Sequence, residues 1–415
     1  MKYIPFDRQV CLSFFEQLIA VDSTTGQYEQ IQKLLCEILD EMGYPYQVTR
    51  KGGVIADLGG KGNALAVTAH LDDIGLMVRR VNADGTLNVC PVGGLYPFYC
   101  MMDNVRIYTR DGKVYTGTVC RTPNSVHVTE EELRDVAPDF RKNVCVVLDE
   151  DVKCAEDVRS LGIETGDMIA LDPRFTVSGG YIKSRFIDDK ASAAVLLTLM
   201  KAMKDEGIAL SRKVYVYFAM YEEIGHGTSW LPEGVCDMLA VDIAPTGPDQ
   251  ASDEHKVSIF AKDSRFPYHW GMTNELRQAA IDAGVDFVMD IFTPHYGTDC
   301  DVSITAATTS VMRLSGRVRR TATGTSGRIL TGLRIRISCW RPIFKETGEG
   351  RQRTGPCLRV QKLHRERPFP AADTRAVVRI DVDFEFLFED ILGQAGRLVG
   401  SQAVLTSGDL FIGGP

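Results

Sequence analysis

The sequence predicts an α/β protein in which a sheet is flanked by helices and a small β module is inserted between the two halves of the domain. In residues 1–75 and 171–304, apolar runs of strand length alternate with amphipathic helical segments. Between them, residues 76–170 form short alternating segments broken by Gly, Asp and Pro, which is typical of an all-β module. A β module inserted into one α/β domain is the simplest arrangement that fits both patterns.

The individual elements are assigned from their periodicity. Apolar residues spaced three and four apart predict helices over residues 7–19, 28–42, 191–203 and 274–283. Apolar runs predict strands over residues 47–58, 64–69 and 213–219, and the β module has strand-like segments at 76–81, 105–108, 114–119 and 144–148. The turn and cap signal Ser23-Thr24-Thr25-Gly26 separates the first two helices.

Composition excludes several classes of protein. The formal net charge of −8 argues against non-specific binding of nucleic acid. No apolar stretch approaches the ~20 residues of a membrane span, and Asp7 and Glu16 interrupt the first apolar pattern, unlike a signal peptide. The 11 cysteines are scattered without a CxxC pair, which indicates reduced thiols and a cytoplasmic protein.

The composition changes near residue 305. Up to Asp301 the chain has 14 Lys and 15 Arg, whereas the remainder has 2 Lys and 16 Arg. From Arg313 to Arg379 no helical or strand period is sustained. Residues 305–415 therefore form a tail of different character, for which a disordered basic segment is one interpretation.

Short acidic or histidine-bearing clusters follow the apolar runs or turns of the α/β parts. Ligands of such sheets gather just beyond the carboxyl ends of the strands, so we expect the clusters to converge. One histidine with several carboxylates suits zinc, cobalt or manganese. The clusters are His70-Leu71-Asp72, Asp188-Asp189, Glu222-Glu223, Asp242 and Gly297-Thr298-Asp299.

Each cluster also has an ordinary structural interpretation. His70 and Asp72 face the same way on an extended chain, so Asp72 can orient the imidazole while His70 binds metal; a surface turn is the alternative. Asp188 precedes a helix and is a candidate bridging ligand, with Asp189 as a cap or supporting group; two N-capping residues are the alternative. Asp242 is a candidate terminal ligand or a turn-initiating residue.

The pair Glu222-Glu223 is the most informative cluster. Two adjacent carboxylates after a buried strand are costly unless they are paired, hydrated or bound to metal. One of them can be a ligand and the other a general base, because neighbours at a strand end point to opposite sides. His226, in the Gly-rich turn that follows, is a weaker ligand candidate, and Asp299 is weak evidence by itself.

In this order the motifs resemble those of the cytosolic dinuclear metallo-aminopeptidase family that includes glutamyl and tetrahedral aminopeptidases. The resemblance covers residues 1–304. It implies a zinc-peptidase-like mixed sheet flanked by helices, with an inserted PDZ-like module that mediates homo-oligomer contacts. It also implies two divalent metal ions per subunit, zinc or cobalt with manganese as an alternative, and peptide substrates. Two departures from the family pattern are Asp73 where Glu is usual and Lys190 where Arg is usual.

The resemblance also assigns roles residue by residue. It places His70, Asp188, Glu223 and Asp242 on the metals, Glu222 as general base and Asp72 as the supporting acid. A metal-dependent deacylase or carboxypeptidase on a similar scaffold is an alternative. So is an inactive scaffold, because the family's fifth ligand, a late histidine in a Tyr-Glu-Arg-Thr-His segment, is missing. His364 is the only histidine after His295, and its surroundings do not match.

The genetic code offers an explanation for the missing segment. When the third base of each codon is read with the first two of the next, residues 306–340 permit the sequence GYDVRHALIGPGAxDRHRYERTHFDGLANTNILL. This resembles the family's missing segment in its expected place. The recovered histidine would span the codons of Arg328 and Ile329, and a stop codon is permitted across Phe344 and Lys345. We therefore expect a frameshift near residues 303–306, with an out-of-frame tail after it.

Overall fold

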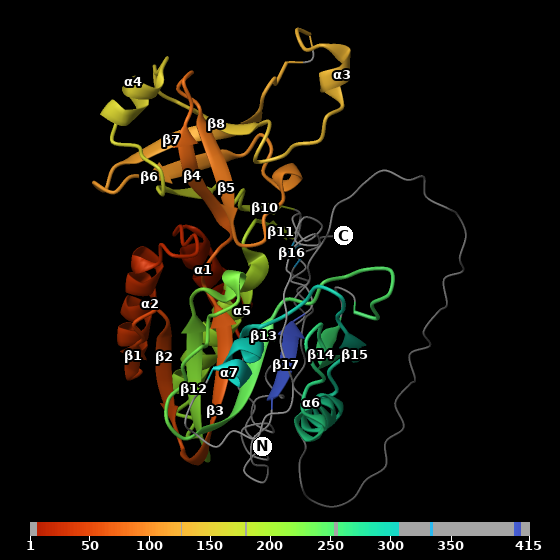
Figure 1. Ribbon diagram of the computed structural model, residues 1–415. Helices are drawn as coiled ribbons and strands as arrows, with labels where there is room; N and C mark the ends of the chain where they lie inside the picture. Colours follow the sequence, from red (N-terminus) through yellow and green to blue (C-terminus); the bar gives the residue numbers. More distant parts are fainter. Residues whose placement is uncertain are drawn as a thin grey trace, which may run out of the picture.

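The computed structural model describes residues 6–125, 127–178, 181–252 and 256–306, together with the backbone of two short strands further on (Figure 1). Within these ranges the chain forms a sheet flanked by helices and a separate closed barrel. The predicted α/β class is confirmed, and the sheet is mixed because it has both antiparallel and parallel pairs. No helix of the described residues is long and apolar enough to span a bilayer.

The helices and short 3₁₀ turns connect strands of either the sheet or the barrel. The helical elements are α1 (Arg8–Ile19), α2 (Glu29–Met42), η1 (Pro97–Tyr99), α3 (Glu131–Arg134), α4 (Ala155–Ser160), α5 (Ile187–Asp205), η2 (Glu222–Ile224), α6 (Trp270–Ala283) and α7 (Asp299–Thr305). The strands of the large sheet are β1 (Tyr46–Val48), β2 (Val54–Gly59), β3 (Lys61–His70), β12 (Arg212–Ala219), β13 (Val235–Asp242), β14 (Val257–Lys262), β15 (Phe287–Ile291) and β17 (Gln402–Ser407).

Strand β3 lies in the middle of the part of the sheet that carries the acidic clusters. The order of the sheet is β1-β2-β12-β3-β13-β17-β14-β15, and β3 is parallel to both of its neighbours. The carboxyl ends of these strands are level, because Ala219 at the end of β12 pairs with His70 at the end of β3. Strand β13 ends at Asp242. The carboxyl ends of three strands, and the side chains carried there, therefore lie at one edge of the sheet.

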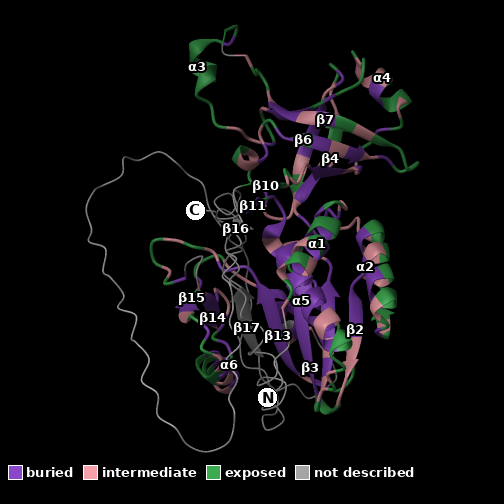
Figure 2. Ribbon diagram, turned by 180° about the vertical axis from the view of Figure 1, so that it is seen from behind, coloured by how far each residue is buried: buried purple, intermediate pink, exposed green. Residues whose placement is uncertain are grey.

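The two faces of the sheet are covered by different helices. Figure 2 shows α1, α2 and α5 over one face, and Figure 1 shows α7 on the other. Successive residues of β3 alternate between these layers: Leu65 and Val67 join the core under α1 and α5, whereas Ala64 and Ala66 join the second core. All four are buried, which fixes the register of the strand and with it the position of His70.

Two elements differ from the sequence-based prediction. Residues 47–58 form a hairpin of β1 and β2 rather than one strand, because Gly52, at φ +86°, closes a turn in which its N–H donates to the Thr49 carbonyl. The helix expected from residue 191 is α5, but its first turn is irregular: Asp188 and Asp189 have non-helical backbone angles. Their side chains are therefore not confined to a regular helical face.

The barrel is the structure of the predicted β module. Its closed strand order is β4-β5-β8-β7-β6-β9, and its strands are β4 (Gly75–Val81), β5 (Leu87–Val92), β6 (Asn104–Tyr108), β7 (Val114–Arg121), β8 (Val144–Leu148) and β9 (Met168–Leu171). Residues 122–143, here called the arm, connect β7 to β8 and carry α3 (Figure 1). The likeness of the barrel to a PDZ module stays a prediction.

Only two pieces of the segment after residue 306 are described. Strand β16 (Leu333–Arg334) pairs with β11 (Tyr181–Lys183), which also pairs with β10 (Thr176–Ser178). Strand β17 lies between β13 and β14, parallel to the first and antiparallel to the second. The expected out-of-frame tail, residues 305–415, and His364 otherwise lie outside the described residues.

Candidate metal centre

The candidate site lies at the edge where β3, β12 and β13 end. His70 is the last residue of β3, Asp242 is the last residue of β13, and Glu222 and Glu223 follow β12 in the short turn η2. Asp188 and Asp189 stand in the irregular first turn of α5. The structure thus brings together residues that are separated by up to 172 positions in the sequence, from His70 to Asp242.

The imidazole of His70 is surrounded by carboxylates. Its Nε2 lies 3.1 Å from Asp188 Oδ1 and 3.7 Å from Glu222 Oε2. Its Nδ1 lies 3.1 Å from the backbone carbonyl of Asp72 and 3.6 Å from Oδ1 of the same residue. Burial acts to lower the pKa of His70, but the hydrogen bonds to Asp188 and Asp72 and the nearby carboxylates raise it well above its usual value. Both ring nitrogens are therefore held in fixed directions.

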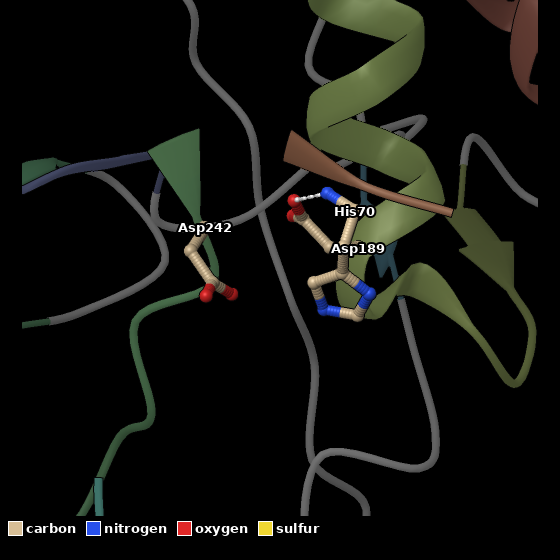
Figure 3. Close-up of side chains that lie close together, drawn as sticks. All are labelled: His70, Asp189 and Asp242. Atoms are coloured by element: carbon tan, nitrogen blue, oxygen red, sulfur yellow. Dashed lines mark hydrogen bonds between the residues drawn. The ribbon is translucent and has the colours of Figure 1, made fainter. Parts of the chain in front are cut away.

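Two groups of potential metal-binding atoms share His70. One consists of His70, Asp188 and Glu223, and the other of His70, Asp189 and Asp242; within each group the atoms lie within 4.8 Å of one another. Figure 3 shows Asp242 approaching from β13 toward the end of β3, across from His70. The four residues assigned to metal by resemblance, His70, Asp188, Glu223 and Asp242, thus meet at one place.

Asp189 lies closer to the centre than a simple cap would. Its Oδ2 accepts the backbone N–H of His70 at 3.2 Å, and Figure 3 shows this carboxylate beside the main chain rather than beside the imidazole nitrogens. Its Oδ1 is buried without a hydrogen-bond partner among the described residues. Because Asp188 faces Nε2 while Asp189 faces the main chain, Asp188 is the better placed of the two to share an ion with His70.

Asp72 organises two ligand-bearing segments at once. Besides its contact with His70, its Oδ1 accepts the backbone N–H of Glu222 at 3.1 Å, and its Oδ2 accepts the backbone N–H of Glu223 at 3.3 Å. The Thr25 hydroxyl donates to Oδ2 at 2.7 Å. Burial acts to raise the pKa of Asp72, but His70, Thr25 and the Glu222 amide stabilise the carboxylate and lower its pKa. Asp72 is therefore an ionised support for the histidine and the glutamate turn.

The glutamate pair does not continue the strand, contrary to the sequence-based argument that neighbours point to opposite sides. Strand β12 ends at Ala219, Tyr221 takes a left-handed conformation with φ 69°, and Glu222 begins a 3₁₀ turn. Gly93 of the barrel packs against the turn, since a Cβ at Gly93 would lie 3.4 Å from the carbonyl oxygen of Glu223. The turn, rather than strand pleating, sets the directions of both side chains.

The electrostatics of the site favour a bound cation. Burial, followed by repulsion from neighbouring carboxylates, raises the pKa of Asp242 to about 8. Burial and repulsion from other acidic groups also raise the pKa values of Asp189, Glu222 and Glu223 well above their usual range, while His70 acts in the opposite direction. So many acidic groups are costly to bury together unless a positive charge lies among them. Oxygen ligands with one imidazole fit a divalent ion of the zinc, cobalt or manganese kind.

Two further residues from the sequence analysis lie beside the centre. His226 stacks on Tyr221 with ring centroids 4.9 Å apart and belongs to neither group of metal-binding atoms found among the described residues. Asp299 is in the first turn of α7, and its Oδ1 accepts the backbone N–H of Thr228 at 3.1 Å. Burial raises the pKa of Asp299 to about 7.

Sequence reasoning missed a buried ion pair beneath the site. Lys190 Nζ donates to Asp73 Oδ2 at 2.6 Å and to the Val21 carbonyl at 2.9 Å, and both charged side chains are almost fully buried. The two residues are the ones that depart from the family pattern, and here they face each other. The sequence did contain a signal for this pair. Both positions differ from the family pattern, and the two changes together keep one acidic and one basic residue, as an ion pair requires.

Comparison with known proteins identifies the family. The family model described as M42 glutamyl aminopeptidase matches residues 52–319. The chain belongs to this family. It is 36% identical over 297 residues to YhfE of Bacillus subtilis, a protein named as an aminopeptidase, and the match covers 71% of this chain and 85% of the relative. The expected resemblance is confirmed, and the protein is a hydrolase of the aminopeptidase class.

Solved structures show the same fold at low sequence identity. A TET aminopeptidase from a marine sediment Thaumarchaeota archaeon has a TM-score of 0.64 at 18% identity, with 72% of this chain and 86% of that chain covered. The TET1 peptidase of Pyrococcus horikoshii has a TM-score of 0.60 at 22% identity, with 70% and 86% covered. These likenesses support the mixed α/β architecture described above.

We predict that the Asp73–Lys190 pair is required for stability. Lys190→Met leaves the Asp73 carboxylate buried without its partner, which costs about 3–5 kcal/mol of unfolding free energy. Lys201→Met is the matched control, because Lys201 pairs with Asp205 at 2.8 Å on an exposed helix surface and should cost no more than about 0.5 kcal/mol. Urea unfolding measures both values, and equal costs would contradict a structural role for the buried pair.

Proposed function

We propose that this chain is built as a dinuclear metal-dependent aminopeptidase that releases N-terminal residues from peptides. The observation that carries the proposal is that His70, Asp188, Glu223 and Asp242 meet where β3, β12 and β13 end and α5 begins, in a member of an aminopeptidase family. Two divalent ions, zinc or cobalt with manganese as an alternative, are the proposed cofactors. The nine free cysteines of the described residues agree with a cytoplasmic protein.

The proposed ligands divide naturally between two ions. Asp188, which has one oxygen beside His70 Nε2, would be shared between the two ions, and His70 and Asp242 would each hold one of them, as the family resemblance implies. Glu223 joins the group of His70 and Asp188. Ions bound there would lower the pKa of water and polarise the carbonyl of the scissile peptide bond.

Glu222 is the proposed general base. It belongs to neither three-residue metal group found among the described residues, yet its Oε2 lies 3.7 Å from His70 Nε2, close enough to reach a water at the centre. It takes the proton of the attacking water and then delivers it to the leaving amine. Asp72 holds Glu222 in place through the backbone N–H and fixes the imidazole of His70 at the same time.

We predict that Glu222→Gln and Glu223→Gln separate base from ligand. In an enzyme with a complete C-terminal segment, Glu222→Gln should retain its metal but lose turnover by a factor of ~10² or more, since the amide cannot accept a proton. Glu223→Gln should lose metal as well as activity. Metal content after dialysis and hydrolysis of amino-acid anilides measure the two effects. A Glu222→Gln variant with near-normal rates would show that the base lies elsewhere.

The competing reaction classes are separated by substrate. An aminopeptidase hydrolyses peptides with a free N-terminal amine and rejects the N-acylated forms, whereas a deacylase of similar architecture shows the opposite preference. An inactive scaffold hydrolyses neither. One observation favours the inactive scaffold. Among the described residues, His70 is the only histidine in either metal group, and the family's late histidine is missing.

The frameshift near codons 303–306 accounts for the missing histidine. Helix α7 ends at Thr305, and the alternative reading begins directly after it with a segment, YDVRHALIG, whose apolar residues suit a strand. A position beside β13 and β14 is occupied in the present chain by β17, almost a hundred residues further on. Continuing from α7 in the other frame would supply a strand without this long connection.

We predict that restoring the frame restores the enzyme. Adding one base or deleting two near codon 304 should give a chain that ends near position 344, binds a second metal ion tightly and hydrolyses peptides. The 415-residue chain should bind its second ion weakly, because one protein ligand is replaced by water. Isothermal titration with zinc compares the two. Full activity of the 415-residue chain would contradict the frameshift and make His364 the first candidate for the missing ligand.

We also propose that the barrel makes the contacts of a homo-oligomer. The support is that the Pyrococcus horikoshii TET1 peptidase assembles into a tetrahedron or a larger octahedral shell. The barrel can be removed cleanly, because Leu76 and Ile169, next to the two cut points, are partners in the β4–β9 pair and a short linker can join the flanking chain. Deletion of residues 76–170 should give a smaller particle by light scattering. An unchanged particle size would exclude the barrel as the interface.

A further inference from the structure

Two cysteines face each other across neighbouring strands of the barrel. Cys120 of β7 and Cys145 of β8 are cross-strand partners in an antiparallel pair. Hydrogen bonds at the two ends of this ladder, from Thr122 N–H to the Asn143 carbonyl and from Asp149 N–H to the Thr116 carbonyl, fix its alternation. Hydrogen-bonded and non-hydrogen-bonded residue pairs alternate along an antiparallel ladder, so every second pair from either end is hydrogen-bonded. Cys120–Cys145 is one of these pairs, with its Cα atoms ~5.5 Å apart and its side chains on one face.

A disulfide can join these two cysteines if the strands move closer together at this point. Disulfides usually join Cα atoms ~4.4–6.8 Å apart, but their Cβ atoms lie ~3.5–4.5 Å apart, against ~4.5–5.5 Å for facing residues of a sheet. A hydrogen-bonded pair lies at the wide end of this range, so the two Cβ atoms must approach by ~1–2 Å. A bond formed under such strain is more easily reduced than a structural disulfide.

The pair lies at the base of the arm. Cys120 and Cys145 are on the outer face of the barrel, since the neighbouring pair Val119 and Val146 is fully buried in the barrel core. Both cysteines are nevertheless only 8% and 5% exposed. Thr122 Oγ1 lies 3.2 Å from Cys145 Sγ. The ends of the arm, residues 122 and 143, are joined by the hydrogen bond that closes the ladder.

The surroundings make Cys145 the attacking thiol. The Thr122 hydroxyl can donate a hydrogen bond to a thiolate at Cys145 Sγ. Burial, followed by the charge of Cys145, raises the pKa of Cys120. Cys120 is therefore better suited to close the disulfide than to attack the oxidant first. Helix α3 has no buried residue, so this middle part of the arm can move without exposing core, whereas Phe140 near the end of the arm stays packed in the core.

We propose that Cys120 and Cys145 form a reversible disulfide that locks the base of the arm. The oxidant is a small-molecule disulfide such as oxidised glutathione. The Cys145 thiolate attacks one of its sulfurs, forms a mixed disulfide and releases one glutathione thiolate, which takes up the proton lost by Cys145. The Cys120 thiolate then attacks the sulfur of Cys145 and releases the second glutathione. Two protein thiols are oxidised by two electrons, and one glutathione disulfide is reduced to two thiols.

The test is a glutathione redox titration of the full 415-residue chain. Alkylation of free thiols followed by peptide mass spectrometry should show two thiols lost together and one cross-linked peptide pair containing Cys120 and Cys145. Cys120→Ser and Cys145→Ser should each abolish the cross-link. Cys90→Ser is the matched control in the same barrel, since Cys90 faces Met77 and should leave the cross-link unchanged.

Two further measurements keep the outcome decisive. Trypsin cleavage after Arg134 and Arg141 in the arm should slow about tenfold on oxidation and recover with a reducing agent, because opening of the arm precedes cleavage. In ~8 M urea the selective pairing should give way to mixed pairings among the chain's 11 cysteines. Glutathione bound to Cys145 without a cross-link, or the same mixed pairings with and without urea, would overturn the proposal.

Discussion

The structure depends on burying many like charges at one edge of a sheet. Asp188, Asp189, Glu222, Glu223 and Asp242 crowd around a single imidazole, and burial together with mutual repulsion destabilises most of these carboxylates. Such a cluster persists only if the backbone that carries it is held rigidly and if cations complete it. The level ends of three parallel strands provide the rigidity, and the helices on both faces of the sheet hold those strands in place.

The supports of the cluster form a layer of their own. Asp72 ties the end of β3 to the turn after β12 through two backbone amides. Asp189 ties β3 to α5 through the His70 amide, and Lys190 ties α5 to the loop after β3 through Asp73. Three of the four ligand-bearing segments, all except the end of β13, are therefore fastened to one another by charged groups that are not themselves proposed ligands. A loss of activity after substitution of Asp72, Asp189 or Lys190 would therefore reflect displaced ligands as much as a lost chemical group.

The sequence predicted the site better than it predicted the connections within it. The apolar runs before His70, Glu222 and Asp242 marked strand ends, and the rule that such ends share an edge brought the residues together. The roles of Asp72 toward the glutamate turn and of Lys190 toward Asp73 could not be predicted, because these contacts join residues more than a hundred positions apart and leave no local periodicity. The hairpin of β1 and β2 was missed because one glycine decides the turn.

The order of the elements along the chain matters during synthesis. All four proposed metal ligands, from His70 to Asp242, are translated before the last 173 residues of the chain. The strands that carry or position them, β3, β12 and β13, pair with one another and need no later segment to do so. A nascent chain can therefore gather most of its metal-binding groups while the ribosome is still reading the remainder. An error downstream would leave a metal-binding sheet in which the edge of β13 stays open to chaperones and proteases until a later segment, here β17, pairs with it.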